Sequence, residues 1–466
     1  MKIVMFSINP LFPKVVTGGA SKHLYHIASH LGKVGHHVEI LCAKTDKSQP
    51  LFKWSENVWV YPILPFNLPF PLPYDTGGPD LSLIIERVSK SLQNADRFYI
   101  HDGEFLIPDV YQHIPTIVSF RDNIYPESVM GSFISKPDEV ICVSEYSEVV
   151  IKHTAGRFYP DLNNRIQQVN NGIDFDRFKP VDIHQLAQEL GLNPEKERIL
   201  LHPHRPEPGK GLLETIRVVD RLVHHYGLNH VKVLIPEWLG SMVSTGDRKF
   251  YDTMVGTMLE LKVRDHFQFV PWLPINRMPE YYSLGEVTLC LGNIVEAFGN
   301  VAYESLACGT PSIVARVGVH RTLLQESIIN KVHFGDIVDS ADQIMAILSE
   351  NRRVTPDALT TLKTKMDFKY QVEQYAQIIL SCRKRDQLQF NIHNHHEKEG
   401  FIIAPWCYLD GERIYHDFQG RFVPAALLNN IFAERTKITK EDAMLIGITQ
   451  ATWEMWVNKT WIIPET

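Results

Sequence analysis

The sequence predicts an α/β fold made of two parallel-sheet domains in tandem, followed by a small α+β module at the C-terminus. Short apolar runs alternate with longer segments of helical period, a pattern typical of parallel strands joined by crossover helices. The alternation fills residues 1–180 and starts again within residues 181–383. The chain of 466 residues is also longer than one ordinary domain. Two such units predict two sheets that face a cleft, which is the usual place for a ligand.

The first domain, residues 1–180, opens on a buried strand at Lys2–Ser7 and a helix at Ala20–Lys33. In the helix, apolar residues recur three and four positions apart, as one buried face requires. Phe66–Pro73 is rich in proline and aromatic residues and therefore cannot be a central strand. It is either a packed surface loop or a loop that lines a ligand pocket. Further buried strands are expected at His37–Ala43, Arg97–Ile100, Thr116–Phe120, Glu139–Val143 and Ile166–Val169.

The second domain, residues 181–383, repeats this pattern. Because helical segments again follow the strands, a second parallel sheet covered by helices is expected. The expected strands are Arg198–His202, Val231–Ile235, His266–Val270, Val287–Leu291 and Pro311–Val314. The expected helices are Gly211–His225, Asp247–Leu261, Met278–Leu284, Gly299–Cys308 and a closing helical segment over residues 356–382.

The last part of the chain begins with a polar, histidine-rich linker at residues 384–400. The accessory module, residues 401–466, has β-hairpin character over Phe401–Val423 and helical character over Thr439–Trp461. Thr439 and the acidic residue three positions later come close to a capping box. The tryptophans of the module favour a small core; a docking surface, a ligand-recognition role and a helix-turn-helix are the alternatives.

Composition and charge limit the classes of function. The net charge of −7 disfavours a nucleic-acid partner, because proteins that bind nucleic acid usually carry a basic surplus. The six cysteines form no CxxC pair and suggest buried thiols in a reducing compartment. No apolar run is long enough for a membrane span, and the N-terminus becomes polar too soon for a signal peptide. We therefore expect a cytoplasmic protein, with peripheral membrane contact left open.

The first candidate site follows the expected strand that ends at Leu291. The sequence Glu296-Ala-Phe-Gly-Asn-Val-Ala-Tyr-Glu304 leads from a loop into a helix. Glu304, one turn into that helix, can accept hydrogen bonds from two adjacent ribose hydroxyls, and Glu296 can reach the hydroxyls of a sugar. Backbone amides at a helix N-terminus bind anions such as a diphosphate, and here they belong to Phe298, Gly299, Asn300 and Val301.

Two further segments supply groups for a phosphate-bearing ligand. In His204-Arg205-Pro-Glu-Pro-Gly-Lys210-Gly211, which follows a strand and opens a helix, Arg205 and Lys210 place two cations beside a flexible glycine turn. A solvated basic turn is the alternative. Gly18 and Gly19 lie between the first strand and the first helix, where glycine lets backbone amides approach a phosphate closely.

In order and spacing, these segments resemble the family-4 retaining glycosyltransferases of the GT-B fold, also called glycosyl transferases group 1. The resemblance covers roughly residues 1–383 and includes Gly35-His36-His37-Val38, Val143-Ser144-Glu145 and Asn171-Gly172-Ile173-Asp174. It implies two facing Rossmann-like domains, with an acceptor side in residues 1–180 and a nucleotide-sugar donor side in residues 181–383. It also implies that Arg205 and Lys210 hold the donor diphosphate, that Glu296 contacts the sugar and that Glu304 contacts the ribose.

The resemblance further implies sugar transfer with retention of configuration from a nucleotide-diphosphate sugar, without a metal or another cofactor. Arg205, Lys210 and the helix amides meet the charge that grows on the departing diphosphate. The departing phosphate oxygen takes the acceptor proton, so no paired catalytic carboxylates of the glycosidase type are needed. The acceptor is a saccharide, a lipid-linked saccharide or a small molecule.

Three positions bear on how far the family pattern applies. The usual family histidine after Thr116–Phe120 is replaced by Arg121, which is either structural or reads a different sugar, such as one that bears a carboxylate. His101 is a second candidate contact of the sugar or acceptor, or a strand-end histidine satisfied within the fold. The usual Gly-Gly after the last motif strand is here Gly318-Val319-His320-Arg321. A GT-B phosphorylase or epimerase and a catalytically silent sugar-nucleotide-binding scaffold are the alternative functions.

Overall fold

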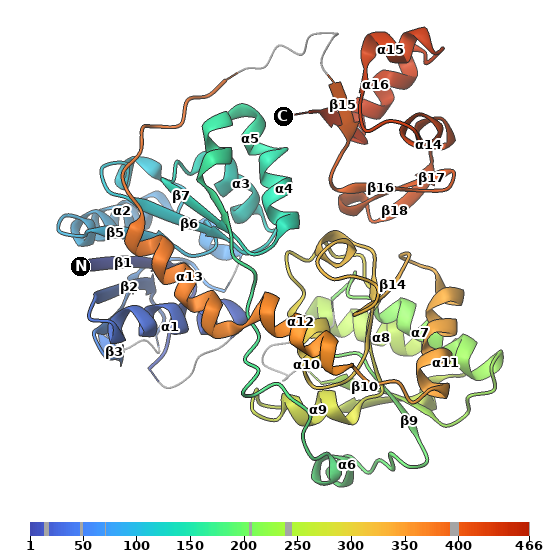
Figure 1. Cartoon of the computed structure of the whole chain (residues 1–466). Helices are drawn as coiled ribbons and strands as arrows, with labels where there is room; N and C mark the ends of the chain where they lie inside the picture. Colours follow the sequence, from blue (N-terminus) through green and yellow to red (C-terminus); the bar gives the residue numbers. More distant parts are fainter. Residues whose placement is uncertain are drawn as a thin grey trace. The chain divides into compact units, whose positions relative to one another are not determined.

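The computed structural model describes residues 1–13, 18–46, 50–69, 71–204, 207–237, 245–391 and 400–465. Contacts within the chain divide it into two compact units. The first unit contains Met1–Asn170, Lys369–Pro405 and Asn430–Thr466, and the second contains Asn171–Phe368 and Trp406–Asn429. Figure 1 carries the element labels that are used below.

The first unit is built on an eight-stranded sheet with the strand order β3-β4-β2-β1-β5-β6-β7-β8. Its neighbouring strands are parallel except for the edge pair β3–β4. The strands are β1 (Lys2–Ser7), β2 (His37–Ala43), β3 (Phe52–Ser55), β4 (Val58–Leu64), β5 (Arg97–Ile100), β6 (Thr116–Phe120), β7 (Glu139–Cys142) and β8 (Ile166–Gln168). The helices are α1 (Gly18–Lys33), α2 (Gly78–Leu92), α3 (Pro126–Ile134), α4 (Glu145–Lys152), α5 (Ala155–Phe158) and α13 (Phe368–Ser381). The expected strands are confirmed, whereas β3 and β4 were not predicted.

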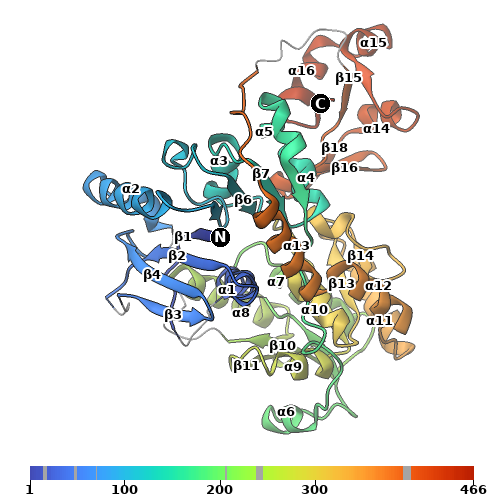
Figure 2. The same cartoon turned by 60° about the vertical axis from the view of Figure 1, so that its left-hand side comes forward.

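Helices cover both faces of this sheet, because alternate residues of a strand point to opposite sides. Ile3 of β1 faces a core that also contains the buried side chains of α1 and α13. Val4, the next residue, faces the opposite core together with α2. Figures 1 and 2 both show α1 and α13 side by side. The first core is therefore completed by a helix that lies more than three hundred residues after its first strand.

The second unit contains a six-stranded parallel sheet with the order β11-β10-β9-β12-β13-β14. One of its faces packs against α7, α8 and α11 in a continuous apolar core. The strands are β9 (Arg198–Leu201), β10 (Val231–Pro236), β11 (Phe267–Val270), β12 (Val287–Cys290), β13 (Ser312–Ala315) and β14 (Asn330–Val332). The helices are α6 (His184–Glu189), α7 (Leu212–His224), α8 (Thr245–Glu260), α9 (Met278–Leu284), α10 (Asn300–Ala307), α11 (Ile337–Ser349) and α12 (Pro356–Met366). The α/β class with two parallel sheets is confirmed.

The division into units differs from the expected domain boundaries at 180, 383 and 400. The closing helical segment 356–382 is two helices, α12 and α13, and α13 packs into the first unit. The start of the expected linker is also held by that unit. Lys384 Nζ lies 3.0 Å from Asp138 Oδ2, and Leu388 is buried in the core that contains α2. Residues 392–399, where the linker histidines cluster, lie outside the described residues.

The expected accessory module, residues 401–466, forms two three-stranded antiparallel sheets. The sheet β16-β17-β18 belongs to the second unit, whereas β19-β15-β20 belongs to the first. The expected helix Thr439–Trp461 is two helices, and Thr439 Oγ1 caps the first by accepting from the Asp442 N–H at 3.0 Å. The elements are β15 (Gly400–Ile403), β16 (Cys407–Asp410), β17 (Arg413–His416), β18 (Arg421–Pro424), α14 (Ala426–Phe432), β19 (Ile438–Thr439), α15 (Lys440–Leu445), α16 (Gln450–Asn458) and β20 (Ile462–Pro464). Within the described ranges, no helix combines the length and the apolar character that crossing a membrane requires.

Candidate functional site

Two loops of the second unit, one after β9 and one after β12, interlock through their backbones. The Asn293 N–H donates to the Gly209 carbonyl at 2.9 Å. A Cβ at Gly211 would lie 2.5 Å from the Gly292 nitrogen, and Gly211 has a φ of +87°. Glycine is required there both for the close approach and for the left-handed backbone. The two loops therefore hold each other, and each carries one of the predicted site residues.

These loops bring together Lys210 and Glu296, two of the residues that the sequence analysis singled out. Lys210 Nζ lies 2.5 Å from Glu296 Oε1, with side-chain exposures of 13% and 29%. Burial opposes ionisation of Glu296, but the Lys210 ammonium holds the pKa of that carboxyl below its ordinary value. The pair is thus a charged, half-buried contact at the edge of the sheet. Arg205, the second predicted cation, lies outside the described residues.

The helix α10 begins beside this pair. Gly299 adopts a left-handed φ of +74° as the N-cap of α10, where a Cβ would lie 2.5 Å from the His320 ring. Phe298 is buried just before the helix, and Asn300 and Val301 form its first turn. Amides of a first helical turn have no partner four residues back, so they are available to an anion. Glu304, one turn further, accepts a hydrogen bond from Tyr282 Oη at 3.1 Å.

Two histidines beside the charged pair were not assigned a role from the sequence. His204 Nε2 lies 3.1 Å from the Leu289 carbonyl, and His320 Nδ1 lies 2.9 Å from Tyr303 Oη. Burial lowers the pKa of each imidazole to about 4. Both rings are therefore neutral at pH 7 and offer hydrogen-bonding groups without adding positive charge.

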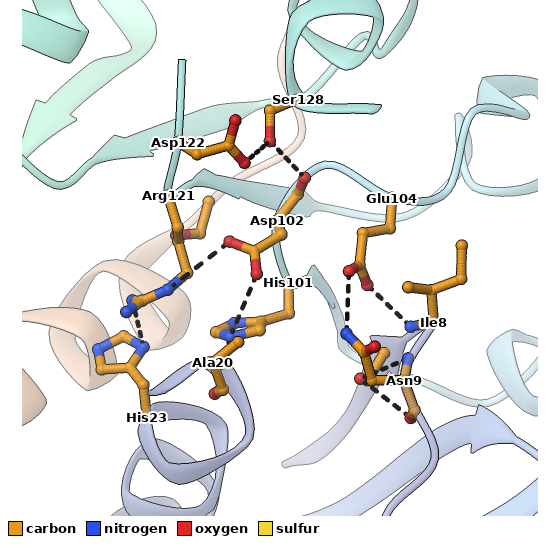
Figure 3. A network of polar contacts seen from close by, with 12 residues as sticks. Ile8, Asn9, Ala20, His23, His101, Asp102, Glu104, Arg121, Asp122 and Ser128 are labelled. Carbon is orange, nitrogen blue, oxygen red and sulfur yellow. Dashed lines mark hydrogen bonds and ion pairs between the residues drawn. The ribbon is translucent and has the colours of Figure 1, made fainter. Parts of the chain in front are cut away.

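The first unit contains a second polar network, which includes the two predicted residues His101 and Arg121 (Figure 3). His101 Nε2 lies 3.1 Å from the Ala20 carbonyl and its Nδ1 lies 2.9 Å from Tyr99 Oη. Because a carbonyl can only accept, Nε2 carries the proton and Nδ1 accepts from the tyrosine. Burial keeps the pKa of His101 well below its ordinary value. His101 is thus a neutral histidine with both ring nitrogens satisfied within the fold.

Arg121 has two partners in the same network. Its Nη1 lies 2.6 Å from His23 Nδ1, and its Nε lies 3.6 Å from Asp102 Oδ1 (Figure 3). A guanidinium only donates, so His23 Nδ1 accepts and the remaining ring proton sits on Nε2. These contacts favour the structural alternative for Arg121. Recognition of a carboxylate-bearing sugar by Arg121 stays a prediction.

Four carboxylates belong to the same network, and the sequence did not single them out. Glu104 accepts a hydrogen bond from the Ile8 N–H at 2.8 Å. Asp102 has a left-handed φ of +61°, and its Oδ1 has no hydrogen-bond partner among the described residues. Burial raises the pKa of Asp102 to about 7 despite the Arg121 guanidinium. The four residues are Asp102, Glu104, Asp122 and Glu127.

Several buried polar atoms of this network have no hydrogen-bond partner among the described residues. Such atoms are uncommon in folded proteins and often mark a place where a ligand binds. They are His23 Nε2, Asp102 Oδ1, Asn123 Nδ2 and Glu127 Oε2. Across the part of the chain that the structure describes, no group of three His, Cys, Asp or Glu side chains is placed to hold a metal ion.

Comparison with known proteins identifies the family. The profile described as Glycosyltransferase Family 4 matches residues 17–177, and the profile described as Glycosyl transferases group 1 matches residues 186–360. The chain belongs to the group 1 and family-4 glycosyltransferases of the GT-B fold. The two matched segments follow one another and contain both polar networks described above.

Individual relatives of this glycosyltransferase chain align over part of their length. The Bacillus subtilis protein YtcC is 23% identical over 265 residues, which is 53% of this chain and 63% of YtcC. The D-inositol 3-phosphate glycosyltransferase 2 of Catenulispora acidiphila is 29% identical over 163 residues, which is 35% of this chain and 37% of the relative. The aligned part is therefore less than two thirds of either relative.

Solved glycosyltransferase structures share the fold. Sucrose-phosphate synthase from Thermosynechococcus elongatus has a TM-score of 0.66 at 17% identity, covering 81% of this chain and 98% of that one. HepE of Anabaena, in complex with UDP and glucose, has a TM-score of 0.64 at 18% identity, covering 82% and 100%. At these identities the likeness concerns the GT-B fold itself.

Gly18 and Gly19, the remaining predicted donor contacts of this glycosyltransferase chain, form the first turn of α1 in the first unit. A Cβ at Gly19 would meet no atom of the described residues within 4 Å. Their contact with a donor stays a prediction.

Proposed function

We propose that this protein transfers a sugar, with retention of configuration and without a metal ion, from a nucleoside diphosphate to an acceptor hydroxyl. The observation that carries the proposal is the short Lys210–Glu296 contact beside the N-terminus of α10. It places a cation, a carboxylate and a set of helix amides on one edge of the second sheet. That combination suits a ligand with a diphosphate at one end and hydroxyls at the other.

Each of these groups has a separate task in the proposed reaction. Lys210 and the amides of Phe298 to Val301 stabilise the negative charge that grows on the diphosphate as the bond from the sugar C1 to the phosphate oxygen breaks. Glu296, kept ionised by Lys210, accepts hydrogen bonds from sugar hydroxyls. Glu304 accepts from the ribose hydroxyls in exchange for, or in addition to, its bond from Tyr282.

Retention requires that the acceptor oxygen bonds to C1 from the side that the diphosphate leaves. The acceptor proton passes to the departing phosphate oxygen, so atoms and charges balance without a protein base. Lys210 and the α10 amides take over the charge neutralisation that a divalent metal performs in other phosphate-transfer sites. Structures of the same fold that contain UDP with glucose, or UDP-2-fluoro glucose, support a nucleotide-sugar donor for this chain.

The first test is thermal stabilisation by a panel of nucleotide sugars, because a ligand that binds the folded state raises the melting temperature. Wild type, Lys210→Ala and Glu304→Ala are compared, and Lys196→Ala, an exposed lysine of the same unit, is the matched control. We expect one donor to stabilise wild type and the control but neither site variant. Absence of any shift in wild type would contradict the proposal, whereas a shift without turnover of the same donor would favour a silent scaffold that binds sugar nucleotides.

A second test follows turnover of the donor found in the panel. Product formation with an acceptor library in the presence of EDTA tests metal independence, and proton NMR of the new anomeric linkage tests retention. Loss of turnover on chelation, restored by a divalent ion, would contradict the metal-free mechanism. A strict requirement for inorganic phosphate would instead indicate a phosphorylase.

A further inference from the structure

The sheet β16-β17-β18 belongs to the second unit. In sequence, α13 and the residues after it separate this sheet from the rest of that unit. The ring of Tyr415 in β17 is fully buried and shares a small core with Ala315 and Val317, which end and follow β13. His333 Nδ1 lies 2.9 Å from Tyr408 Oη, and the two rings are stacked. We call residues 406–424 the C-terminal ribbon. Apolar and polar contacts together attach it next to the end of β13.

Asp417, in the short helical turn Asp417–Gln419 after β17, makes the central polar contact of the C-terminal ribbon. Its side chain is fully buried, and its Oδ1 and Oδ2 accept from Arg321 Nη1 at 3.1 Å and Nη2 at 2.8 Å. Oδ1 also accepts from the Gly318 N–H at 3.2 Å. A two-pronged contact between a guanidinium and a carboxylate fixes orientation as well as distance. Asp417 therefore holds both ends of the turn Gly318–Arg321.

The turn Gly318–Arg321 lies directly behind the donor-site residues. The Val319 N–H points at the Glu296 carbonyl at 3.4 Å, and a Cβ at Gly318 would lie 3.0 Å from that same oxygen. The His320 ring of this turn occupies the space next to Gly299, the N-cap of α10. A shift of the turn would therefore move the backbone that carries the Glu296 carboxylate and the start of α10.

The C-terminal ribbon also contacts the loop after β12, which carries Glu296. Asn293 Nδ2 points at the Gly420 carbonyl at 3.4 Å, and a Cβ at Gly420 would lie 2.6 Å from Asn293 Nδ2. Asn293 is the residue whose N–H binds the Gly209 carbonyl, next to Lys210. The ribbon thus contacts the loop of Glu296 at two places, at Asn293 and through the turn Gly318–Arg321.

We infer that Asp417 is a positioning residue for the donor site, and that the C-terminal ribbon completes this site instead of forming a separate module. The inference rests on the proposed function. The side chain of Arg321 in that turn binds the carboxylate that the ribbon supplies.

Asp417→Asn tests this inference, because it keeps the shape of the side chain and removes the charge that binds Arg321. Glu412→Gln, an exposed carboxylate of the same ribbon, is the matched control. We expect Asp417→Asn to lower kcat/KM for the donor about tenfold or more, mainly through KM, since small displacements of binding groups are costly. The control keeps the wild-type kcat and KM.

Hydrogen exchange of the intact protein separates positioning from general destabilisation. In Asp417→Asn we expect faster exchange of the amides in residues 293–299 and 318–322, and unchanged protection in α7 and α11. Faster exchange confined to the ribbon, together with an unchanged donor KM, would overturn the inference. If wild type turns over no nucleotide sugar, the proposed function fails, but the exchange pattern still decides whether Asp417 orders the two loops.

Arg321→Lys is a milder second variant for the case that Asp417→Asn does not fold. It keeps the positive charge and loses the two-pronged geometry. If Asp417 acts through Arg321, the double variant Asp417→Asn/Arg321→Lys will be no more impaired in kcat/KM than the worse single variant. Additive losses would contradict the inference.

Discussion

The polar network of the second unit is half-buried and that of the first unit is mostly buried, and their charges are balanced differently. In the second unit Lys210 and Glu296 form a matched pair, and the pKa of the Glu296 carboxyl is lowered. In the first unit four carboxylates share a network with Arg121, which is also bound to His23, and the pKa of Asp102 is raised to about 7. The same physical forces thus give an ionised site in one unit and a proton-holding network in the other.

The difference between the two networks shows when attraction to a nearby cation outweighs the loss of water that burial imposes on a carboxylate. A carboxylate that loses water stays charged if a cation lies within hydrogen-bond distance, as Lys210 does at 2.5 Å from Glu296. Arg121 Nε is 3.6 Å from Asp102 Oδ1, and the neighbouring carboxylates repel further negative charge. The matched pair is therefore suited to charge that develops in a reaction, whereas the unmatched network responds to pH.

The largest expected effect is on the matched pair. Lys210→Met removes the cation but keeps most of the apolar stem, so we expect turnover of the donor to fall by about 10²–10³, the usual cost of losing one group that stabilises developing charge. Steady-state rates at saturating donor measure this loss. Lys196→Met is the control, and a similar rate for both variants would show that Lys210 has no catalytic role.

Arg121→Met breaks the unmatched network and tests stability. Removing one partner of a buried ion pair usually costs about 3–5 kcal/mol, but Asp102 can take up a proton, so we expect about 1–3 kcal/mol. Urea unfolding at pH 6 and at pH 8 measures the loss, with the exposed Arg383→Met as the control. The loss is larger at pH 8, where Asp102 is ionised. Equal losses at both pH values would contradict the proton-holding network.

Asp102→Asn tests how much Asp102 contributes to the pH dependence of stability in the first unit. Because the folded pKa of about 7 lies above the ordinary value of 3.8, folded Asp102 retains a proton between these values that the unfolded chain has lost. Wild-type stability therefore falls as pH rises through this window. We expect the variant to flatten the fall by about 2–3 kcal/mol between pH 5 and 7.5. An unchanged slope, equal to that of the exposed Asp109→Asn, would show that Asp102 is not responsible.

The smallest expected effect concerns Tyr282, an uncharged residue that donates a hydrogen bond to Glu304. Tyr282→Phe leaves Glu304 without its bond from the phenol, and such a bond is worth about 0.5–1.5 kcal/mol. We expect donor affinity, measured by calorimetry, to weaken by no more than about tenfold. Tyr251→Phe in the same unit provides the comparison. A loss as large as that of Glu304→Ala would mean that Tyr282 itself contacts the donor.

The sequence predicted the parallel strands well because apolar runs of that kind are buried on both faces. It missed β4, since Pro62 within Val58–Leu64 argues against a strand. β4 nevertheless pairs with β2 through most of its length. The antiparallel neighbour β3 has only four residues, too few to show a period.

The candidate site was predictable where its residues are local to a strand–loop–helix motif. Lys210 and Glu296 both follow parallel strands, whose carboxyl ends meet at one edge of a sheet. Asp417 and Arg321 are 96 positions apart, and no sequence motif predicts their contact. The network around Asp102 depends on a left-handed residue and on buried carboxylates from separate loops, neither of which has a sequence period.

The contact between Arg321 and Asp417 also sets the order in which a nascent chain can finish its donor site. The second sheet is complete once β14 has left the ribosome, but the partner of Arg321 follows 96 residues behind that arginine. At a synthesis rate of about 5–20 residues per second, the turn Gly318–Arg321 stays without its buried carboxylate for roughly 5–20 s. A ribosome-released fragment that stops before the ribbon would therefore contain every donor-site residue and still lack the finished site.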